Sequence, residues 1–376
     1  MRIGIDARTL THFKFGGLFT YVSNFIPPLV ELAQDYEIFV YLDQKLPYEF
    51  SFNEDHVTVR YLPWSNVFSS LRNDLSIDRY MRQDGVDVAH FPANTGFCTG
   101  DIKNVLTLHD EINILPLKEI IRGHAKDPRT ISMMSYLHFQ SLQAVRNADL
   151  IVTVSEYSRR QIAAHSDFDV QRIIPVHHAP TADFARIEDA EILKEVCRRH
   201  QLDKQFVLAD ALKNPKTLIK AWRCLSPELK KNREIVFFSR RPNPLPIVFE
   251  AVDEGIARLL VRPSRPDLIA LFSMADIFVF PSWIEGFGLP ILEAMTCGAP
   301  VIASDRGSIP EVAQNAALIC DAEDIETMTA YLTQVLSSPQ ETERLRQLGF
   351  ARAADFSWKK TARQILDTYE RALSLP

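Results

Sequence analysis

The feature that most constrains the fold is an alternation of short apolar runs with helix-like segments. It begins with "RIGID", "EIFVYL", "VTVRYL", "VDVAHF", "NVLTLHD" and "DLIVTVS". It resumes later with "FVLAD", "EIVFFS", "IARLLV", "DIFVFP", "PVIAS" and "AALIC". Strands that alternate with helices form parallel sheets with helices on both faces. Two such series predict an α/β fold with two Rossmann-like domains.

The length of 376 residues also favours two domains, because it exceeds what a single hydrophobic core usually supports. The predicted connection is "VQRIIPVHHAPTADF", residues 170–184, which separates domains at 1–177 and 178–355. The closing segment 356–376 contains the amphipathic pattern "FSWKKTARQILDTYERAL" and is predicted to form a helix that crosses back to the N-terminal domain. Ligands of open α/β sheets bind beyond the carboxyl ends of the strands, so a central cleft between the domains is the expected site.

Composition excludes several classes of protein. A net charge of −6 and a pI near 6.0 argue against nucleic acid as a partner. The five cysteines are scattered without a CxxC pair, so neither a zinc site nor a disulfide framework is predicted. The first residues predict a strand rather than a signal peptide, and no apolar run approaches about 18 residues. We therefore expect a soluble, cytoplasmic protein.

The stretch "PSWIEGFGLPILEAM" carries the most specific chemistry. Gly286 and Gly288 lie in a strand-to-helix turn, where they let a backbone approach a ligand closely. The following helix start, with Pro290 in its first turn, suits a phosphate. Glu293, about one turn into the helix, can accept two hydrogen bonds from a ribose diol, and Glu285 can accept hydroxyls of a second sugar. The alternative is that the glycines only shape a turn and Glu293 pairs with a basic neighbour.

The spacing of Glu285 and Glu293 resembles the paired-glutamate motif of retaining GT-B glycosyltransferases of family 4. The resemblance extends through "RPDLIALFSMADIFVF", "TCGAPVIASDRGSIPEVAQNAALICDAED" and the closing "FSWKKTA". It also includes "RIGIDARTL", "FGGLFTYV", "NVLTLHD" and "ADLIVTVSEYSRRQI", and so covers nearly the whole chain. It implies the GT-B architecture, in which two Rossmann-like domains have parallel sheets that face a central cleft.

The resemblance also implies roles for individual residues. Glu293 would bind the nucleotide ribose, Glu285 would lie near the donor sugar, and the backbone of 286–289 would contact the sugar and diphosphate. Gly16 and Gly17 would face the diphosphate from the other domain. His109 would lie beside the transferred sugar, and Asp110 would either orient it or cap the next turn. The residues assigned to donor binding are therefore Gly16, Gly17, Lys213, Arg240, Arg241, Glu285, Gly286, Phe287, Gly288, Leu289 and Glu293, and the catalytic candidates are His109, Glu285 and Lys213.

The chain departs from the family pattern at the position of one cation. A leaving nucleoside diphosphate needs cations or oriented dipoles, which the family supplies from an Arg-Lys pair after a strand. Here "FVLADALKNP" keeps Lys213, but Leu212 occupies the expected arginine position. The next strand ends in "FFSRRPNP", where Arg240 and Arg241 replace a glycine. One of these arginines could replace the lost cation, or both could be a solvated pair at a strand end.

Two acidic patterns, "DFD" at 167–169 and "DAE" at 321–323, look like metal-binding signatures. The first lies beside the predicted connection between domains, and the second follows a strand and is expected to cap a helix. We interpret both as turns. The prediction is therefore that the protein uses neither a metal nor a resident cofactor.

The sequence thus predicts a retaining glycosyltransferase with a nucleotide-diphosphate sugar as donor. The motifs look most like those of mannosyltransferases that use GDP-mannose, and family analogy indicates a glycan or lipid-linked glycan as acceptor. The resemblance implies front-face substitution, which needs no enzymic nucleophile. Two alternatives stay open from the residues: a nucleotide-sugar epimerase or phosphorylase on the same fold, and a non-catalytic relative that only binds nucleotide-sugars.

A basic segment suggests weak peripheral contact with the inner face of a membrane. "LKEIIRGHAKDPRT", from Leu117, carries four basic residues ahead of an apolar helix. Glu119 and Asp127 reduce its charge to about +2, so any attachment should be weak and salt-sensitive. The alternative is an ordinary surface, with Met133, Met134, Leu137 and Phe139 in the core.

Overall fold

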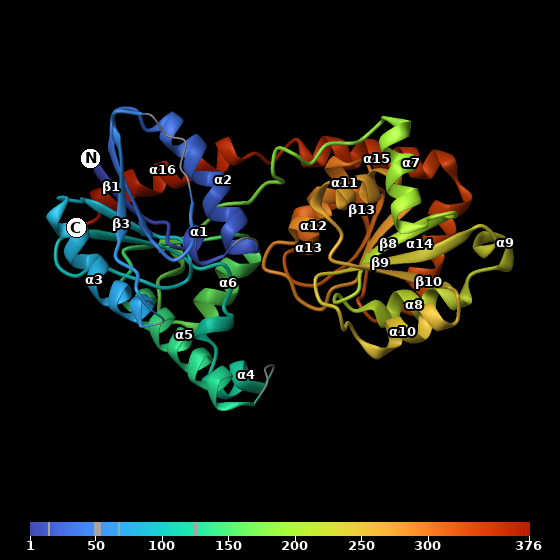
Figure 1. Ribbon diagram of the computed structural model, residues 1–376, viewed down its shortest axis with the longest axis horizontal. Coiled ribbons are helices and arrows are strands. Elements are labelled where there is room, and N and C mark those ends of the chain that lie inside the picture. Colours follow the sequence, from blue (N-terminus) through green and yellow to red (C-terminus); the bar gives the residue numbers. More distant parts are fainter. Residues whose placement is uncertain (14–15, 49–53, 67, 123–125) are drawn as a thin grey trace. The chain divides into compact units, whose positions relative to one another are not determined.

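A computed structural model of the chain describes residues 1–13, 16–48, 54–66, 68–122 and 126–376 (Figure 1). The chain forms two compact units. Unit 1 comprises Met1–His178 together with Trp358–Pro376, and unit 2 comprises Ala179–Ser357. The backbone therefore passes between the units twice, after His178 and before Trp358.

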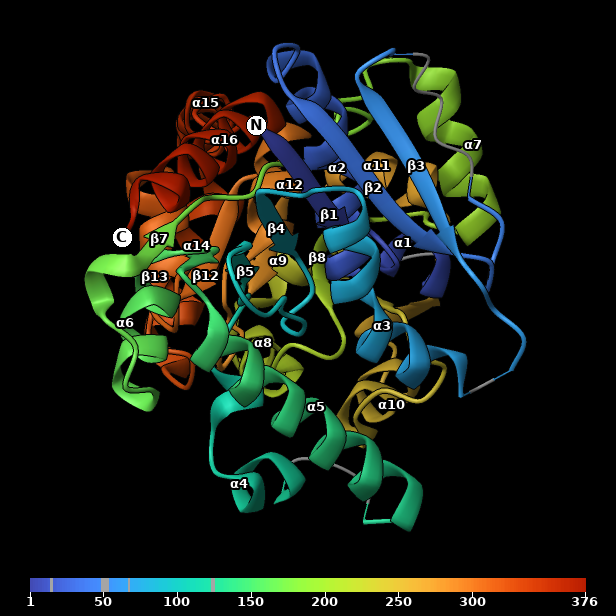
Figure 2. The same cartoon turned by 90° about the vertical axis from the view of Figure 1, so that its left-hand side faces the viewer.

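Unit 1 is built on a parallel sheet in the order β3-β2-β1-β4-β5-β6-β7. Figure 2 shows β3, β2 and β1 side by side. In the described residues its strands are β1 (Arg2–Asp6), β2 (Glu37–Asp43), β3 (Val57–Leu62), β4 (Val88–Phe91), β5 (Lys103–Thr107), β6 (Leu150–Thr153) and β7 (Ile173–Pro175).

Unit 2 repeats this plan with a parallel sheet in the order β10-β9-β8-β11-β12-β13. Its strands are β8 (Gln205–Asp210), β9 (Arg233–Ser239), β10 (Ala257–Val261), β11 (Ile277–Phe280), β12 (Val301–Ser304) and β13 (Ala317–Cys320). Two parallel α/β sheets in one chain confirm the fold class that the alternation predicts.

Helices connect most successive strands, as is usual for parallel pairing, but in the described residues none lies between β2 and β3 or between β4 and β5. Those of unit 1 are α1 (Thr9–His12), α2 (Gly17–Leu32), α3 (Ser69–Gln83), α4 (Leu117–Arg122), α5 (Pro128–Asn147), α6 (Glu156–His165) and α16 (Trp358–Ser374), with 3-10 turns η1 (Ile112–Ile114) and η2 (Val170–Arg172). Those of unit 2 are α7 (Ala190–His200), α8 (Pro215–Cys224), α9 (Pro227–Lys230), α10 (Pro246–Asp253), α11 (Arg265–Met274), α12 (Leu289–Thr296), α13 (Ile309–Ala313), η3 (Gln314–Ala316), α14 (Ile325–Ser337) and α15 (Pro339–Ala353).

Both faces of each sheet are buried, which explains why the strands read as continuous apolar runs. In β2, Ile38 and Val40 pack into one core with α2 and α16, whereas Phe39 and Tyr41 pack into a second core with α3, α5 and α6. In unit 2, one core contains side chains of α8, α10 and α14. On the other face, α11 covers the sheet through an edge-to-face contact between Phe272 and Phe278, whose ring centroids are 5.0 Å apart.

The last helix, α16, belongs to the core of unit 1 although it is more than 170 residues distant in sequence. Its residues Ile365, Leu366, Tyr369 and Ala372 are buried among side chains of β1 and α2. Figure 1 shows α16 lying beside α2. The amphipathic pattern of residues 356–373 therefore has a physical cause, because one face of the helix closes a hydrophobic core.

The chain leaves unit 1 after His178, inside the predicted connection 170–184, and Ile173–Pro175 near its start still belong to unit 1. These residues form β7, which pairs in parallel with β6 at the edge of the sheet. The strand is short and ends in a proline, and proline is tolerated at an edge because its missing N–H is not needed there. No helix of the described residues is long and apolar enough to cross a membrane.

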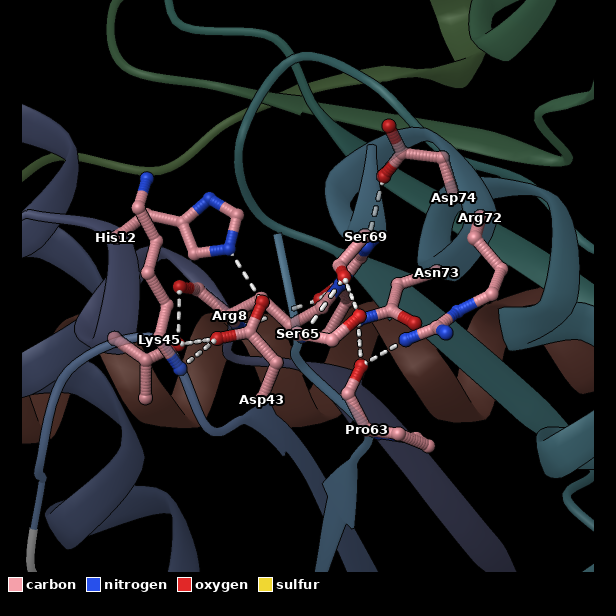
Figure 3. A network of polar contacts seen from close by, with 12 residues as sticks. Arg8, His12, Asp43, Lys45, Pro63, Ser65, Ser69, Arg72, Asn73 and Asp74 are labelled. Carbon is pink, nitrogen blue, oxygen red and sulfur yellow. Dashed lines mark hydrogen bonds and ion pairs between the residues drawn. The ribbon is translucent and has the colours of Figure 1, made fainter. Parts of the chain in front are cut away.

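A buried ion-pair network fixes the loop that follows β1 (Figure 3). The guanidinium of Arg8 binds both carboxylate oxygens of Asp6, at 2.8 and 2.6 Å, and reaches Asp74 of α3 at 2.7 Å. Tyr136 of α5 also donates to Asp74. Nearby, Thr11 donates to the buried Asp43 at 2.7 Å. The loop between β1 and α2 is therefore anchored to β1, β2, α3 and α5.

We expect Arg8→Met to destabilise the protein strongly, because it leaves the buried Asp6 carboxylate without its cation. Losing one partner of a buried ion pair costs about 3–5 kcal/mol. Chemical denaturation measures this loss. The matched control is Arg2→Met at the other end of β1, where Arg2 and Glu37 form a pair that is about half exposed on each side. That change should cost less than about 1 kcal/mol, and equal effects of the two variants would contradict the assignment.

Candidate functional site

The candidate site of unit 2 is centred on an ion pair at the carboxyl ends of its strands. Lys213 follows β8, and Glu285 lies in the loop between β11 and α12. Lys213 Nζ and Glu285 Oε1 are 2.6 Å apart. The hydroxyl of Ser282 donates to the same oxygen at 2.8 Å. Two residues that are 72 positions apart in the chain are thus brought together.

Asn214 explains why Lys213 is held at this place. It has a left-handed backbone with φ of 50° and is buried at the start of α8. Its side-chain amide donates to the carbonyl oxygens of Pro281 and Ala322, at 3.0 and 2.8 Å. This one amide therefore joins the loops that follow β8, β11 and β13.

A further loop, which sequence reasoning did not single out, supports Glu285 from the other side. The backbone N–H and the hydroxyl of Ser308 each donate to the Glu285 carbonyl at 3.1 Å. Gly307 has φ of 61°, and a Cβ at this position would lie 2.3 Å from the same carbonyl oxygen. Only glycine permits this approach. The signal in the sequence was a glycine soon after a strand, in "IASDRGS".

The start of α12 presents the positive end of a helix, although Pro290 has no N–H and the Ile291 N–H donates to the Gly288 carbonyl oxygen at 3.0 Å. Gly288 caps the helix with φ of 88°, and Leu289 and Pro290 form its first residues. The N–H groups of a first helical turn lack partners within the helix and carry a partial positive charge. Phe287 is only 6% exposed, and its ring packs edge-on against Phe356 with centroids 6.0 Å apart. Its side chain is therefore part of the protein interior.

Glu293 lies one turn into α12 and is surrounded by protein. Burial raises the pKa of its carboxyl to about 7, although the charges of Arg265 and Arg240 act in the opposite direction. Within the described residues, no hydrogen bond or ion pair involves this carboxylate. Arg265 binds Asp183 instead. The alternative in which Glu293 pairs with a basic neighbour is therefore not what the structure shows.

The two arginines that follow β9 differ in their interactions. Both are exposed, but the charge of Arg240 lowers the pKa values of both Asp210 and Glu293. Asp210, at the end of β8, nevertheless has a raised pKa because it is buried. The backbone N–H and carbonyl oxygen of Arg241 both form hydrogen bonds with the Ser239 hydroxyl, whereas its side chain forms none with the described residues. Arg240 is therefore the cation that lies close enough to act on the site.

Leu212 contributes no charge. Its backbone N–H donates to Asp210 Oδ1 at 2.8 Å, which shapes the turn that leads to Lys213. The cations near the carboxylates of this site are thus Lys213 and Arg240, with Arg265 close to Glu293.

In unit 1, Gly16 and Gly17 form the start of α2. Gly16 has φ of 121°, a conformation that favours glycine. A Cβ at either glycine would meet no atom within 4 Å. The backbone here therefore faces open space, as the approach of a ligand would require.

His109 follows β5 and is held by two hydrogen bonds. Its backbone N–H donates to Asn94 Oδ1 at 2.9 Å, and its Nε2 lies 3.0 Å from the carbonyl oxygen of Pro92. A carbonyl can only accept, so Nε2 carries the proton and Nδ1 is left as an acceptor in the neutral ring. Burial lowers the pKa of His109 to about 4. The ring of Tyr21, from the first turns of α2, contacts it edge-on at 4.9 Å between centroids.

Asp110 does not orient His109. Its Oδ1 accepts from the backbone N–H of Ile112 at 2.9 Å and so caps the turn before η1. Burial raises its pKa to about 6.

The two acidic patterns, "DFD" at 167–169 and "DAE" at 321–323, also form hydrogen bonds within local turns. Asp169 accepts from the N–H of Gln171 at 2.9 Å, and Asp321 accepts from that of Glu323 at 2.8 Å.

The predicted residues thus gather into two groups. In unit 2, Lys213, Glu285 and Asp210 surround one strand-end region, and Arg240 acts on it through its charge. In unit 1, the Gly16–Gly17 loop leads directly into Tyr21, which contacts His109. The side chain of Arg241 makes no hydrogen bond or ion pair with the described residues of either group.

Known proteins resemble the chain in both sequence and fold. Residues 15–179 match Glycosyltransferase Family 4, and residues 208–352 match the glycosyl transferases group 1. Over 275 residues the chain is 33% identical to the O-antigen chain mannosyltransferase B of Escherichia coli, which covers 71% of this chain and 70% of that protein. It is 29% identical over 282 residues to the serotype-specific mannosyltransferase WbdA of Escherichia coli, over 72% of this chain and 34% of that protein.

Among solved structures, sucrose-phosphate synthase from Thermosynechococcus elongatus superposes with a TM-score of 0.70 at 16% identity, over 98% of each chain. A likeness at this identity establishes the fold, whereas the sequence matches establish the family. The chain therefore belongs to glycosyltransferase family 4 and is a glycosyltransferase with the GT-B fold.

Proposed function

We propose that the protein is a retaining mannosyltransferase that moves mannose from a nucleotide-diphosphate mannose to a hydroxyl of a glycan. The observation that carries the proposal is the Glu293 carboxylate, which is surrounded by protein yet has no hydrogen-bond partner in the described residues. Eight positions earlier, Glu285 is held by Lys213. The preference for mannose is supported by the names of the two Escherichia coli relatives.

Each residue of the unit 2 group has a role in this proposal. The Glu293 carboxylate accepts the two ribose hydroxyls, which supply the partners that the protein does not. Lys213 and the first turn of α12 stabilise the diphosphate, and Arg240 adds a second positive charge. Glu285 keeps Lys213 in place and accepts hydroxyls of the donor sugar.

The reaction exchanges one bond at the anomeric carbon of the sugar. The bond from this carbon to the diphosphate oxygen breaks, and a bond to the acceptor oxygen forms on the same face. Negative charge grows on the departing phosphate oxygen as the bond breaks, because the bonding electrons stay with that oxygen, and the acceptor proton then passes to it. Lys213, Arg240 and the helix start carry this charge, so the proposal includes no resident metal or other cofactor.

Two other functions were open from the residues. The family matches and the names of the relatives favour sugar transfer over a nucleotide-sugar epimerase or phosphorylase. A non-catalytic relative is suggested only by Leu212 in place of an arginine. The position of Arg240 near both Asp210 and Glu293 favours a working site, because it supplies a second cation.

The acceptor in this proposal is a growing glycan, which would be attached to a lipid. The enzyme would then work close to a membrane.

A basic surface of unit 1 supports contact with an anionic membrane. Lys118, Arg122, Lys126 and Arg129 are all exposed, although residues 123–125 lie outside the described part of the chain. Met133 and Phe139 are 51% and 63% exposed, so the prediction that they belong to the core is wrong. Met134 and Leu137 are half-buried.

The proposal is tested by measuring binding and transfer with GDP-mannose and matched UDP-sugars, using oligomannosides as acceptors. We expect GDP-mannose to bind most tightly, and the product to keep the anomeric configuration of the donor. Activity should persist in EDTA. Binding without any transfer would indicate the non-catalytic alternative. An inverted product, or activity restored only by a divalent metal, would overturn the mechanism.

We expect the affinity for GDP-mannose to depend on pH through Glu293. The raised pKa of about 7 means that part of the protein holds this carboxyl protonated near neutrality. Ribose hydroxyls donate most favourably to the ionised form, so affinity should rise as pH increases through 7. If only the ionised form binds, affinity at pH 6 should be about 10-fold weaker than at pH 8. Calorimetry between pH 5.5 and 8.5 measures this, because the diphosphate of GDP-mannose does not titrate in that range.

Glu293→Gln is the matched control for this dependence. It keeps the size of the side chain and removes the titration, so the affinity of the variant for GDP-mannose should be weak and independent of pH.

The raised carboxyl pKa of Glu293 also lowers the free energy of unfolding as pH rises from 4.5 toward 7, because the folded state retains the proton. The glutamine variant should therefore be at least as stable as the wild type at pH 8. A wild-type affinity that is flat with pH would reject the role of Glu293.

We expect Arg240→Ala and Arg241→Ala to have unequal effects. Only Arg240 acts on Asp210 and Glu293, so its loss should weaken donor binding by about 10-fold, whereas Arg241→Ala should change it less than about 2-fold. The two variants are adjacent and remove the same charge, so each controls for the other. Equal losses would show a general electrostatic effect, and no loss in either would show that Arg240 does not replace the missing cation.

We expect weak binding of the protein to anionic vesicles at low salt, and its loss at high salt. Arg122→Glu combined with Lys126→Glu should abolish it. A control variant with Lys216→Glu and Lys220→Glu changes the charge equally on the exposed side of α8 and should retain binding. Co-sedimentation measures all three proteins. Binding that is unchanged by the first pair would assign membrane contact to another surface.

A further inference from the structure

The two connections between the units enter unit 1 side by side. The first ends at His178 and the second begins at Trp358. The rings of these two residues lie 5.7 Å apart between centroids, at an angle of 31°. One turn along α16, Thr361 Oγ1 donates to the carbonyl oxygen of His177 at 2.7 Å. Both crossings are therefore fixed to each other at the edge of the unit.

A continuous stack of rings leads from this point to His109. His178 stacks on Tyr21, with centroids 4.8 Å apart and planes 24° apart. Tyr21 meets His109 edge-on at 4.9 Å, and His178 also meets His109 at 5.5 Å. The sequence separation from Trp358 to His109 is large, yet in the described residues the rings of His178 and Tyr21 link the two.

Tyr21 and His178 are the buried part of the stack, whereas Trp358 and His109 are half-buried. Tyr21 is 1% exposed and His178 is 8% exposed. Burial lowers the pKa values of His178 and His109, so both rings are neutral at pH 7. Close-packed interiors transmit displacement instead of absorbing it, because they contain few voids into which a ring could move.

Hydrogen bonds attach the same stack to a second point of α16. The Tyr21 hydroxyl lies 3.2 Å from Thr107 Oγ1, which lies 2.7 Å from His90 Nε2. The other nitrogen of His90 lies 2.7 Å from the Tyr369 hydroxyl. Burial lowers the pKa of His90 to about 3, so this ring is also neutral. The last helix thus contacts the surroundings of His109 through both Trp358 and Tyr369.

We propose that His178 and Trp358 are positioning residues for His109, which transmit the placement of the two inter-unit connections to its imidazole through Tyr21. Unit 2 is joined to unit 1 by covalent bonds only after His178 and before Trp358. A change in the direction in which either connection leaves unit 1 acts first on these two rings. It then acts on Tyr21, whose ring contacts His109. The inference rests on the proposed function and on the place beside the transferred sugar that the family resemblance implies for His109.

The experiment compares His178→Ala and Trp358→Ala with the ring-preserving variants His178→Phe and Trp358→Phe. We expect each alanine variant to lower kcat by at least about 10-fold while the Kd for GDP-mannose changes less than about 2-fold, because small displacements of a reacting group are costly. The phenylalanine variants should recover most of kcat. The double alanine variant should lose less than the product of the two single losses, since the two rings contact each other and act on the same imidazole.

A second measurement does not depend on turnover. In spectra of protein labelled with ¹⁵N-histidine, the ring signals of His109, assigned from His109→Asn, should shift in both alanine variants and return in the phenylalanine variants. His138→Ala is the matched control, because His138 is half-buried in unit 1 and its Nδ1 donates to the Asn113 carbonyl oxygen at 2.8 Å, outside the stack. It should leave the His109 signals and kcat unchanged.

The outcomes separate this proposal from the proposed function. If the wild type transfers no sugar, the proposed function fails, and the ring signals still test the stack. Unchanged His109 signals in both alanine variants would overturn the stack. Shifted signals with an unchanged kcat in an active enzyme would overturn the positioning role. Losses that the phenylalanine variants do not recover would also overturn it, because stacking would then not be the cause.

Discussion

Parallel strands cannot be joined by a tight turn, and each must be followed by a crossover that passes over a face of the sheet. All the loops that leave the carboxyl ends of the strands therefore gather along one edge. In unit 2, this constraint brings together Lys213 after β8, Arg240 after β9 and Glu285 after β11. In unit 1, it places the Gly16–Gly17 loop and His109 at the same edge of another sheet. The topology of the parallel sheets therefore decides which residues can form the candidate site.

Charge balance then decides how the unit 2 site is prepared for a ligand. Lys213 is bound by Glu285, and Arg265 is bound by Asp183, so two cations are already occupied by carboxylates. Glu293 is left without a direct partner in the described residues, and burial raises its pKa to about 7. A diol would supply hydrogen bonds to this carboxylate, and a diphosphate would meet Lys213 in a fixed position. The protein thus orders its cations by pairing them with acids, at the cost of some electrostatic attraction for the donor.

The last helix has more than one role in unit 1. Its apolar face closes the core against β1 and α2, which is a stabilising role that any amphipathic helix could fill. Trp358 and Tyr369 add specific contacts, since they reach the ring stack and the hydrogen-bond chain around His109. A single helix therefore connects the boundary of the unit, its core and its candidate site residue.

The sequence by itself determined the fold class and the outline of the site. Apolar runs in a repeating alternation dictate parallel sheets, and the spacing of Glu285 and Glu293 around two glycines identifies the family, because both signals are local in the chain. The tertiary structure alone decided that Asn214 and Gly307 support the loop that carries Glu285. It also decided that the charge of Arg240, rather than that of Arg241, lowers the pKa of Asp210. In unit 1 it added β7 to the edge of the sheet. It also decided that Asp110 caps a turn while Tyr21 contacts His109. These contacts join residues that are distant in sequence or depend on which way a side chain points. Neither property leaves a periodic trace in the amino-acid sequence, because both are set only when the sheets and helices pack.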